Sequence, residues 1–226
     1  MPDIVEITNA YAFAKDGRVV LEDINLRLGS GEKVFLAAPL GTGKGLLLRW
    51  IAGVERPDKG SVSVFGKDTS LLDGDGLNAL RCRLGLIIQE NCLISNLKVI
   101  ENCLLPLLYH TNMPYPEAAA KAFSLLESTG FTADPWEMPG PLPGYVKKQV
   151  LIARALVLGP EIIICENLGD GLTPFERARL FELILNYRTS GSGALILFTS
   201  TDIEDAAFIR PDRTLRIEKN RIVEER

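Results

Sequence analysis

The sequence predicts an α/β protein in which helices cover both faces of a parallel β-sheet. Segments typical of strands alternate with segments of helical spacing over most of the 226 residues. Two of the strand-like segments, 162–165 and 194–198, contain only apolar residues. Strands of that composition are buried on both faces, which is the usual situation in a parallel sheet.

The first 88 residues contain most of the strand signals. Apolar residues alternate in short runs that end at Asp16-Gly17 and at 29–31, as expected for strands joined by tight turns. One stretch, 45–53, has the apolar spacing of a helix and stops at its final glycine. We predict strands within residues 3–13, 18–28, 32–38, 60–68 and 83–91.

The middle of the chain, residues 93–158, is predicted to be helical. Three stretches there carry apolar residues three and four positions apart, separated by Pro and Gly clusters: 98–110, 115–131 and 145–159. Strands and helices then alternate again, and the end is predicted to form a hairpin that turns at Lys219-Asn220. No internal repeat or long linker divides the chain.

Composition excludes several classes of ligand. The net charge is −4 and no cluster of Lys and Arg is present, so nucleic acid is not an expected partner. One histidine and four cysteines without short paired spacing predict no zinc site. No apolar run reaches the roughly 18–20 residues that a membrane span needs, and the N-terminus lacks a secretory pattern. We therefore expect a cytoplasmic protein that reaches a membrane only through a partner.

The stretch with the clearest chemistry is LAAPLGTGKGLLLRWIAG, residues 36–53. It places a glycine-rich turn between a predicted strand and a predicted helix, close to the phosphate-loop pattern G-x-x-x-x-G-K-[ST]. Glycines let backbone N–H groups close around phosphate oxygens, and the helix start adds partial positive charge. The lysine meets the outer phosphates, and the hydroxyl after it binds Mg²⁺. The phosphate loop of this chain comprises Ala38, Pro39, Leu40, Gly41, Thr42, Gly43, Lys44 and Gly45.

Two positions of this loop depart from the pattern. Ala38 replaces the first glycine, which is compatible with binding only if that backbone does not need a positive φ. Gly45 replaces the hydroxyl residue and Leu46 follows it, so no side chain there offers an oxygen to Mg²⁺. From the loop alone, a glycine-rich turn with an unrelated lysine is an alternative.

Later segments favour nucleotide binding, because they follow one another in a familiar order. The chain resembles the ATP-binding subunit of ABC transporters along nearly its whole length. The resemblance rests on LEDINLRLGSGEKVFLAAPLGTGKGLLLRWIAG, LGLIIQEN, LPGYVKKQVLIARAL, GPEIIICENLGDGL and ILFTSTDIEDA, at the usual order and separation. VLIARAL followed by P-E-I-I-I is its most specific part.

The resemblance implies a P-loop NTPase with a RecA-like core, an N-terminal antiparallel β subdomain and an inserted α-helical subdomain, all within one domain over residues 1–226. Residues 1–88 and 159–226 would form the core and the β subdomain, and 89–158 the helical subdomain.

The resemblance also implies ATP as the ligand. It is bound by the phosphate loop and Leu46, with Gln89 and Glu166 as candidate Mg²⁺ ligands. An aromatic residue of the first strand, Tyr11 or Phe13, would stack on adenine, and plain strand packing explains either ring equally well.

Departures from the family pattern concentrate at the positions that perform the chemistry. Asn167 stands where a glutamate polarises the attacking water, and an amide cannot accept a proton at any useful pH. Thr201 replaces the switch histidine, and Thr173 replaces the aspartate of the D-loop. Because phosphoryl transfer depends on such positioned groups, losing several together predicts a subunit that hydrolyses ATP very slowly or not at all.

The signature segment, LSGGQ in the family, is also altered. Proline at its second position removes a serine hydroxyl, which would contact the γ-phosphate bound to the opposite subunit, and a backbone N–H donor. A tyrosine fills the place of the second glycine, where it could obstruct a close approach. The segment consists of Leu142, Pro143, Gly144, Tyr145 and Val146.

Three functions stay open at this point. The first is a degenerate ABC subunit, structural or regulatory, with hydrolysis lost or very weak and nucleotide binding weakened. The second is an active but divergent ATPase, for which Asp170 is the only nearby candidate to replace the missing carboxylate. The third is an interaction module that no longer binds nucleotide.

The expected partner is a membrane-embedded permease, which places the chain on the inner face of the cell membrane. Residues 98–118 follow the Gln89 segment, where ABC subunits dock on the permease, and an exposed apolar groove there would fit docking as well as ordinary helix packing does. Pro143 and Tyr145 make a homodimer around nucleotide doubtful and leave a constitutive or a mixed dimer. ENCLLPLLYH is most similar to MCE-type lipid transporters, then to lipoprotein-release transporters.

Overall fold

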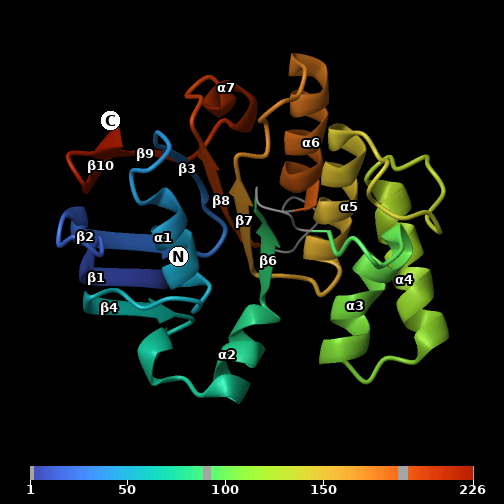
Figure 1. Ribbon diagram of the computed structural model, residues 1–226, viewed down its shortest axis with the longest axis horizontal. Coiled ribbons are helices and arrows are strands. Elements are labelled where there is room, and N and C mark those ends of the chain that lie inside the picture. The colour runs from blue at the N-terminus through green and yellow to red at the C-terminus, as the bar shows by residue number, and fades with distance from the viewer. Residues whose placement is uncertain (1–2, 89–92, 188–192, 226) are drawn as a thin grey trace.

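A computed structural model describes residues 3–88, 93–187 and 193–225 (Figure 1). The strands of its larger sheet are β3 (Lys33–Ala37), β6 (Leu84–Ile87), β7 (Ile162–Glu166), β8 (Leu195–Ser200), β9 (Arg213–Glu218) and β10 (Arg221–Glu225). They lie in the order β10-β9-β3-β8-β7-β6, parallel throughout except for β10, which pairs antiparallel with β9. The predicted α/β class with a parallel sheet is confirmed.

A smaller antiparallel sheet is built from the N-terminal part of the chain. Its strands are β1 (Asp3–Phe13), β2 (Val19–Gly29), β4 (Lys59–Val64) and β5 (Lys67–Asp68), in the order β2-β1-β4-β5. Strand β1 pairs antiparallel with both β2 and β4. The expected N-terminal antiparallel sheet is therefore present.

The helices lie between and beside these two sheets. They are α1 (Lys44–Ile51), α2 (Gly74–Arg81), α3 (Val99–His110), α4 (Tyr115–Ser128), α5 (Gly144–Leu156), α6 (Pro174–Tyr187) and α7 (Asp205–Ile209), with a short 3₁₀ turn at Thr69–Leu71. Figure 1 shows α3, α4 and α5 grouped at one side of the molecule, opposite the sheet of β1, β2 and β4. Of the described helices, none combines the length and the apolar character required to cross a membrane.

The side chains of the large sheet alternate between two hydrophobic cores. In β7, Ile162 and Ile164 belong to the core that α1 and the small sheet complete. Ile163 and Cys165 belong to the other core, which contains buried residues of α5, α6 and α7. Successive side chains of a strand point to opposite faces, so a strand between two cores must be apolar at every position. The uninterrupted apolar runs in the sequence have this origin.

A third core holds the helical part together. Buried residues of α3, α4 and α5 pack on one another there. Asn102 of α3 is fully buried and fixes the loop before the helix, accepting a hydrogen bond from the Ile94 amide (2.7 Å) and donating one to the Ile94 carbonyl (3.1 Å). A buried amide paired in this way costs little, because its polar atoms have exchanged water for backbone partners.

The chain ends in the predicted hairpin. β9 and β10 are joined by Lys219 and Asn220, whose φ angles of 47° and 67° are both positive. Two left-handed residues define the two-residue turn whose twist matches that of the flanking strands. The predicted turn at Lys219-Asn220 is confirmed.

Candidate functional site

The phosphate loop lies between β3 and α1, at the carboxyl end of the parallel strands, where ligands of open α/β sheets bind. Gly41 and Gly43 have φ angles of 79° and 94°, whereas Ala38 is not among the residues with positive φ. Ala38 is buried, and its amide donates to the Ser200 carbonyl of β8 at 3.0 Å. Replacing the first glycine by alanine therefore leaves the loop without strain at that residue.

Gly43 is needed for the loop to approach β2. A Cβ built on it would lie 2.8 Å from side-chain carbons of Leu21, and the residue adopts a left-handed conformation. The loop is further shaped by the Thr42 hydroxyl, which donates to the Pro39 carbonyl at 2.8 Å. Helix α1 follows directly, with the amide of Leu46 donating to the Gly43 carbonyl at 3.0 Å. The amides at the start of this helix give the loop partial positive charge.

The lysine of the loop is paired with the amide that follows β7. Nζ of Lys44 donates to Oδ1 of Asn167 at 2.6 Å, and both residues are almost fully buried. Burial lowers the pKa of Lys44, and the negative charges of Glu166 and Asp170 partly oppose that change. Asn167 has a φ of 49°, a conformation that asparagine tolerates better than most residues. Its backbone N–H donates to the Thr199 carbonyl at 2.8 Å. The structure thus brings together Lys44, Glu166, Asn167 and Asp170.

A cavity of about 280 Å³ opens beside this pair. It is lined by Gly45, Arg49, Glu166 and Asn167 together with apolar side chains, among them the exposed Leu40. A Cβ built on Gly45 would lie 3.2 Å from Nη1 of Arg49 and 3.8 Å from Oε1 of Glu166. The cavity is therefore a mixed site in which a guanidinium and a carboxylate both lie close to Gly45.

Mg²⁺ prefers a near-octahedral shell of oxygen ligands, and among the described residues Glu166 is the carboxylate that lines this cavity. Gly45 provides no hydroxyl, and the guanidinium of Arg49 lies next to the place where a side chain at position 45 would begin. Within the described part of the chain, no group of three His, Cys, Asp or Glu side chains is placed to hold a metal ion. Glu166 is the one predicted ligand that can be located, since Gln89 lies outside the described residues.

The signature segment lies at the start of α5. Leu142 is buried in the helical core, and the exposed Pro143 precedes the helix with a φ of −56°. Gly144 is the first helical residue. Tyr145 is half-buried and packs on the core of α5 and α6, while Val146 packs on the helical core. Part of the tyrosine is thus held inside the protein, which reduces the obstruction expected of it.

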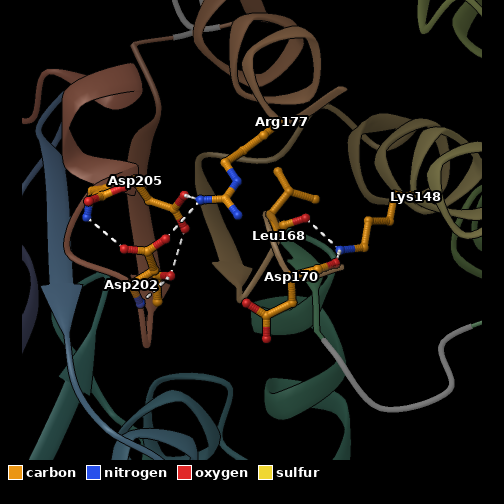
Figure 2. A network of polar contacts seen from close by, with 8 residues as sticks. Lys148, Leu168, Asp170, Arg177, Asp202 and Asp205 are labelled. Carbon is orange, nitrogen blue, oxygen red and sulfur yellow. Dashed lines mark hydrogen bonds and ion pairs between the residues drawn. The ribbon is translucent and has the colours of Figure 1, made fainter. Parts of the chain in front are cut away.

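Lys148 of α5 connects the helical part to the loop after β7, as Figure 2 shows. Its Nζ donates to the carbonyls of Leu168 (2.6 Å) and Asp170 (2.7 Å). Burial lowers the pKa of Lys148, and the nearby charge of Asp170 opposes the shift. One ammonium group therefore holds two carbonyls of the segment that carries Asn167.

Arg177 of α6 makes a second polar cluster in the same view (Figure 2). Its Nη1 donates to Oδ2 of Asp202 at 2.9 Å and to Oδ1 of Asp205 at 2.7 Å. The Ser200 hydroxyl donates to Oδ2 of Asp205 at 2.6 Å. Burial raises the pKa of Asp205, while the bonds from Ser200 and Arg177 lower it. Thr201, at the switch position between these residues, is exposed.

Thr173 has a structural role at the start of α6. Its hydroxyl and its amide donate to Oε2 of Glu176 at 2.8 and 2.9 Å, and the Glu176 amide donates back to the hydroxyl at 3.3 Å. This reciprocal arrangement is a capping box, and the sequence T-P-F-E contains its signature. The sequence interpretation considered only the D-loop role of this position and missed the cap.

Three further residues of the site, Arg49, Lys148 and Arg177, were not predicted. The partners of Lys148 and Arg177 lie 20 to 28 positions away in the chain, so no local sequence pattern predicts these hydrogen bonds. Arg49 lies four residues after Gly45 on α1, and that spacing was a usable signal because such residues share a helix face.

The two candidate adenine contacts, Tyr11 and Phe13, lie side by side on β1. Their rings are 6.3 Å apart and nearly parallel, with an interplanar angle of 10°. Nζ of Lys59 lies 5.8 Å from the Tyr11 ring centroid and 5.6 Å from that of Phe13. Both rings present apolar faces next to a cation, and both stay candidates.

Comparison with known proteins gives consistent results. The sequence model of the ABC transporter family matches residues 21–167. The chain is 32% identical over 225 residues to "Methionine import ATP-binding protein MetN" of Coxiella burnetii, and 31% identical over 180 residues to "Probable ribonucleotide transport ATP-binding protein mkl" of Mycobacterium leprae. These alignments cover 100% and 80% of this chain but 63% and 52% of the relatives, so the chain spans less than two thirds of their lengths.

Solved structures show the same architecture. The ATP-binding cassette MJ0796, determined as a dimer in a post-hydrolysis state with ADP and Pi, superposes with a TM-score of 0.89 at 27% identity, covering 98% of both chains. The protein cbiO1 of Clostridium perfringens, part of the transporter complex cbiONQ, has the same fold, with a TM-score of 0.86 at 22% identity over 99% of this chain and 88% of that one. With the family match and the identity to MetN, these likenesses establish that the chain belongs to the ABC transporter family of ATP-binding domains.

Proposed function

We propose that the chain is a degenerate nucleotide-binding subunit of an ABC transporter, which holds nucleotide phosphates weakly and does not hydrolyse ATP at a useful rate. Domains of this family bind ATP with Mg²⁺. The observation that carries the proposal is the 2.6 Å hydrogen bond from Lys44 to Asn167. This bond engages the ammonium group of the lysine that is expected to meet the outer phosphates. Its partner is the side-chain amide of Asn167, which stands where the family has its general base.

The amide explains the expected loss of hydrolysis. A general base must take a proton from the attacking water, and an amide oxygen does not do so near neutral pH. Gly45 offers no hydroxyl, and the exposed Thr201 has no imidazole. Removing one preorganised oxyanion-hole donor costs about 2.7–4 kcal/mol of transition-state stabilisation, and we expect the loss of several positioned groups here to place turnover near background.

Weak retention of phosphate is supported by the loop itself. Gly41 and Gly43 keep the left-handed conformations that turn backbone amides inward, and Lys44 keeps its position at the first turn of α1. To meet a phosphate, Nζ of Lys44 must give up its bond to Asn167. That exchange lowers the net gain from binding, because one charge-assisted hydrogen bond replaces another.

We further propose that the chain serves a membrane permease from the cytoplasmic side. ABC cassettes work with membrane permeases and form dimers. Helix α3 presents exposed apolar side chains, Leu105, Leu108 and Tyr109, within the 98–118 stretch suited to docking. Because Pro143 provides neither a hydroxyl nor an N–H donor at the signature, we expect a constitutive or mixed dimer and not a nucleotide-dependent homodimer.

The divergent-ATPase alternative has one observation in its favour. Burial lowers the pKa of Lys44, and the charges of Glu166 and Asp170 oppose that shift, which supports Asp170 as a carboxylate within electrostatic reach of the phosphate loop. The backbone carbonyl of Asp170 is held by Lys148, which fixes this part of the loop.

On cargo, the relatives carry different names, methionine import and ribonucleotide transport. The α3 sequence supports lipid or lipoprotein transport as the proposed class.

Thermal unfolding with ATP, alongside phosphate release, tests the proposal. We expect the Tm to rise with millimolar ATP and phosphate release to stay at background. Free ATP at ten times its Kd adds about 1.4 kcal/mol to the folded state, which a Tm measurement resolves. Steady turnover that Lys44→Ala abolishes would contradict the loss of hydrolysis. A flat Tm would favour an interaction module that no longer binds nucleotide.

A further inference from the structure

The segment that carries Asn167 is held by an ammonium group from another helix. Nζ of Lys148 donates to the carbonyls of Leu168 at 2.6 Å and Asp170 at 2.7 Å, as Figure 2 shows. Leu168 directly follows Asn167, whose side chain accepts the hydrogen bond from Lys44. Lys148 therefore fixes the backbone immediately beside the buried pair of the phosphate site.

The backbone of Asn167 is itself engaged through both of its polar groups. Its N–H donates to the Thr199 carbonyl at 2.8 Å, and its carbonyl accepts from the Asp170 N–H at 3.2 Å. The carbonyl of Asp170 is one of the two that Lys148 holds. Asn167 has a φ of 49°, and a non-glycine residue keeps such a conformation only where its surroundings enforce it. Lys148 thus closes the far end of the turn that sets the position of Asn167.

Lys148 is a firm anchor because α5 packs into two hydrophobic cores. Val150 and Ala153 belong to the helical core, and Ile152 belongs to the core shared with α6 and α7. Burial lowers the pKa of Lys148, which shows that its ammonium group is partly removed from water. Hydrogen bonds from a charged donor are stronger than those between neutral groups, so the loop is held tightly against a packed helix.

We propose that Lys148 is a positioning residue of the phosphate site, which keeps Asn167 on Lys44 and thereby weakens the binding of nucleotide. The inference rests on the proposed function, in which the loop around Lys44 holds nucleotide phosphates weakly. A phosphate oxygen must displace the amide oxygen of Asn167 from the lysine. An acceptor that is already fixed in place competes better, because its ordering has been achieved during folding and not at the moment of contact.

The effect of removing Lys148 separates this role from a merely structural one. If Lys148 positions Asn167, its removal loosens the competing acceptor and frees Lys44, so ATP should bind more tightly. If Lys148 only holds two parts of the protein together, its removal should leave the ATP affinity of the folded protein unchanged or reduce it.

The test is calorimetric titration of ATP into the whole chain and its variants. Asn167→Gly removes the competing amide and should tighten ATP binding by about tenfold, the effect of deleting one charge-assisted hydrogen bond that the ligand must replace. Lys148→Met should tighten binding by about threefold to tenfold, since the amide remains but is less firmly placed. In Asn167→Gly/Lys148→Met the affinity should equal that of Asn167→Gly, because Lys148 then has no acceptor to position.

Lys147→Met is the matched control. Lys147 precedes Lys148 on α5, and its Nζ donates to the Gly140 carbonyl, away from the loop after β7. Its removal should change the ATP affinity by less than about twofold, as is usual for an exposed charge. A milder variant, Lys148→Gln, retains a neutral donor and should give an affinity between those of wild type and Lys148→Met.

Three results would overturn the inference. The first is an ATP affinity of folded Lys148→Met that equals or falls below that of wild type. The second is a double variant in which the two single effects multiply, since residues that act independently give additive free energies. If Lys148→Met does not fold, a folded Lys148→Gln that binds ATP no more tightly than wild type overturns it equally.

Phosphate release from the same samples reports separately on the proposed function. Turnover by wild type contradicts the proposed loss of hydrolysis, whatever the order of the affinities. Unexpected affinities in proteins that bind ATP without hydrolysing it overturn the inference alone. ATP binding by none of these proteins overturns the inference together with the nucleotide binding on which it rests.

Discussion

Nζ of Lys44 lies 2.6 Å from Oδ1 of Asn167, and neither residue is more than 4% exposed. The pair joins the phosphate loop to the loop after β7, across two segments that are 123 positions apart in the chain. A buried ammonium needs a partner, since desolvation favours its neutral form and lowers its pKa. The asparagine therefore has a structural role that is independent of any catalytic role at its position.

Removing the amide should destabilise the fold. In Asn167→Gly the backbone keeps its left-handed conformation, and Lys44 loses a hydrogen bond, so we expect a loss of about 1–3 kcal/mol in unfolding free energy. Asn167→Ala should lose about 1–2 kcal/mol more, because alanine disfavours the φ of 49°. Urea unfolding measures both. Equal stability of wild type and Asn167→Gly would show that the hydrogen bond contributes nothing.

Asp170 decides between the degenerate subunit and the divergent ATPase. For a degenerate subunit, phosphate release is at background in wild type and stays there in Asp170→Asn, since no carboxylate acts as a base. An active ATPase that uses this carboxylate would lose most of its rate in the same variant. Asp170→Asn leaves the backbone carbonyl that Lys148 holds, so the loop keeps its shape.

Lys148 should stabilise the junction between the helical part and the core. Lys148→Met keeps most of the aliphatic stem and leaves the Leu168 and Asp170 carbonyls without their ammonium donor, and we expect a loss of about 1–3 kcal/mol in unfolding free energy. Lys147→Met is the control, because the acceptor of Lys147 Nζ among the described residues is the Gly140 carbonyl, which precedes the same helix. If both variants unfold at the same urea concentration, the junction does not depend on Lys148.

One ion pair should give a measurable pH dependence. Arg83 donates to both carboxylate oxygens of Glu161, at 2.6 and 2.8 Å, and this lowers the pKa of Glu161 below its ordinary 4.5. A lowered pKa in the folded state means that the stabilisation is complete above pH 4.5 and is lost as the pH falls through the folded-state value. Both groups are about half exposed, so we expect only about 0.2–1 kcal/mol. The stability difference between wild type and Glu161→Gln, measured by urea unfolding, should shrink from pH 7 to pH 3.

The capping box at the start of α6 should contribute to the free energy of unfolding. Thr173→Ala removes the hydroxyl that exchanges hydrogen bonds with Glu176, and the expected cost is about 0.5–2 kcal/mol. Thr173→Ser retains the cap and should remain within about 0.5 kcal/mol of wild type. A cost to Thr173→Ser as large as that of Thr173→Ala, measured by urea unfolding, would rule out the cap as the cause.

The sequence predicted the scaffold well because the scaffold depends on local patterns. Alternation and helical spacing are properties of neighbouring residues, and the apolar run of β7 directly indicated burial on both faces. The hairpin turn at Lys219 and Asn220 was predicted from its place within the strand-like segment at the end of the chain. These features do not depend on distant partners.

The site was predicted in position but not in its contacts. Order along the chain placed Lys44 and Asn167 in one site, yet nothing local indicated that they would bond to each other. Lys148 and Arg177 belong to helices whose apolar spacing predicts only which face is buried. Their polar partners lie far away in the sequence and depend on how the helices pack in the folded protein. Two contacts could have been predicted from local sequence. The capping-box pattern indicates the bond of Thr173 to Glu176, and the four-residue spacing indicates that Arg49 lies beside Gly45 on α1.

The two cores on either side of β7 have a consequence for how this protein can change over evolutionary time. Ile162 through Cys165 meet both cores, and the strand's last residue and the asparagine after it contribute little apolar contact. The strand is therefore constrained by apolar packing on both faces, whereas Asn167 after it is constrained by its polar contact with Lys44. A polar substitution at position 167 leaves both cores in place, so the scaffold can outlast a change in the chemistry of its site.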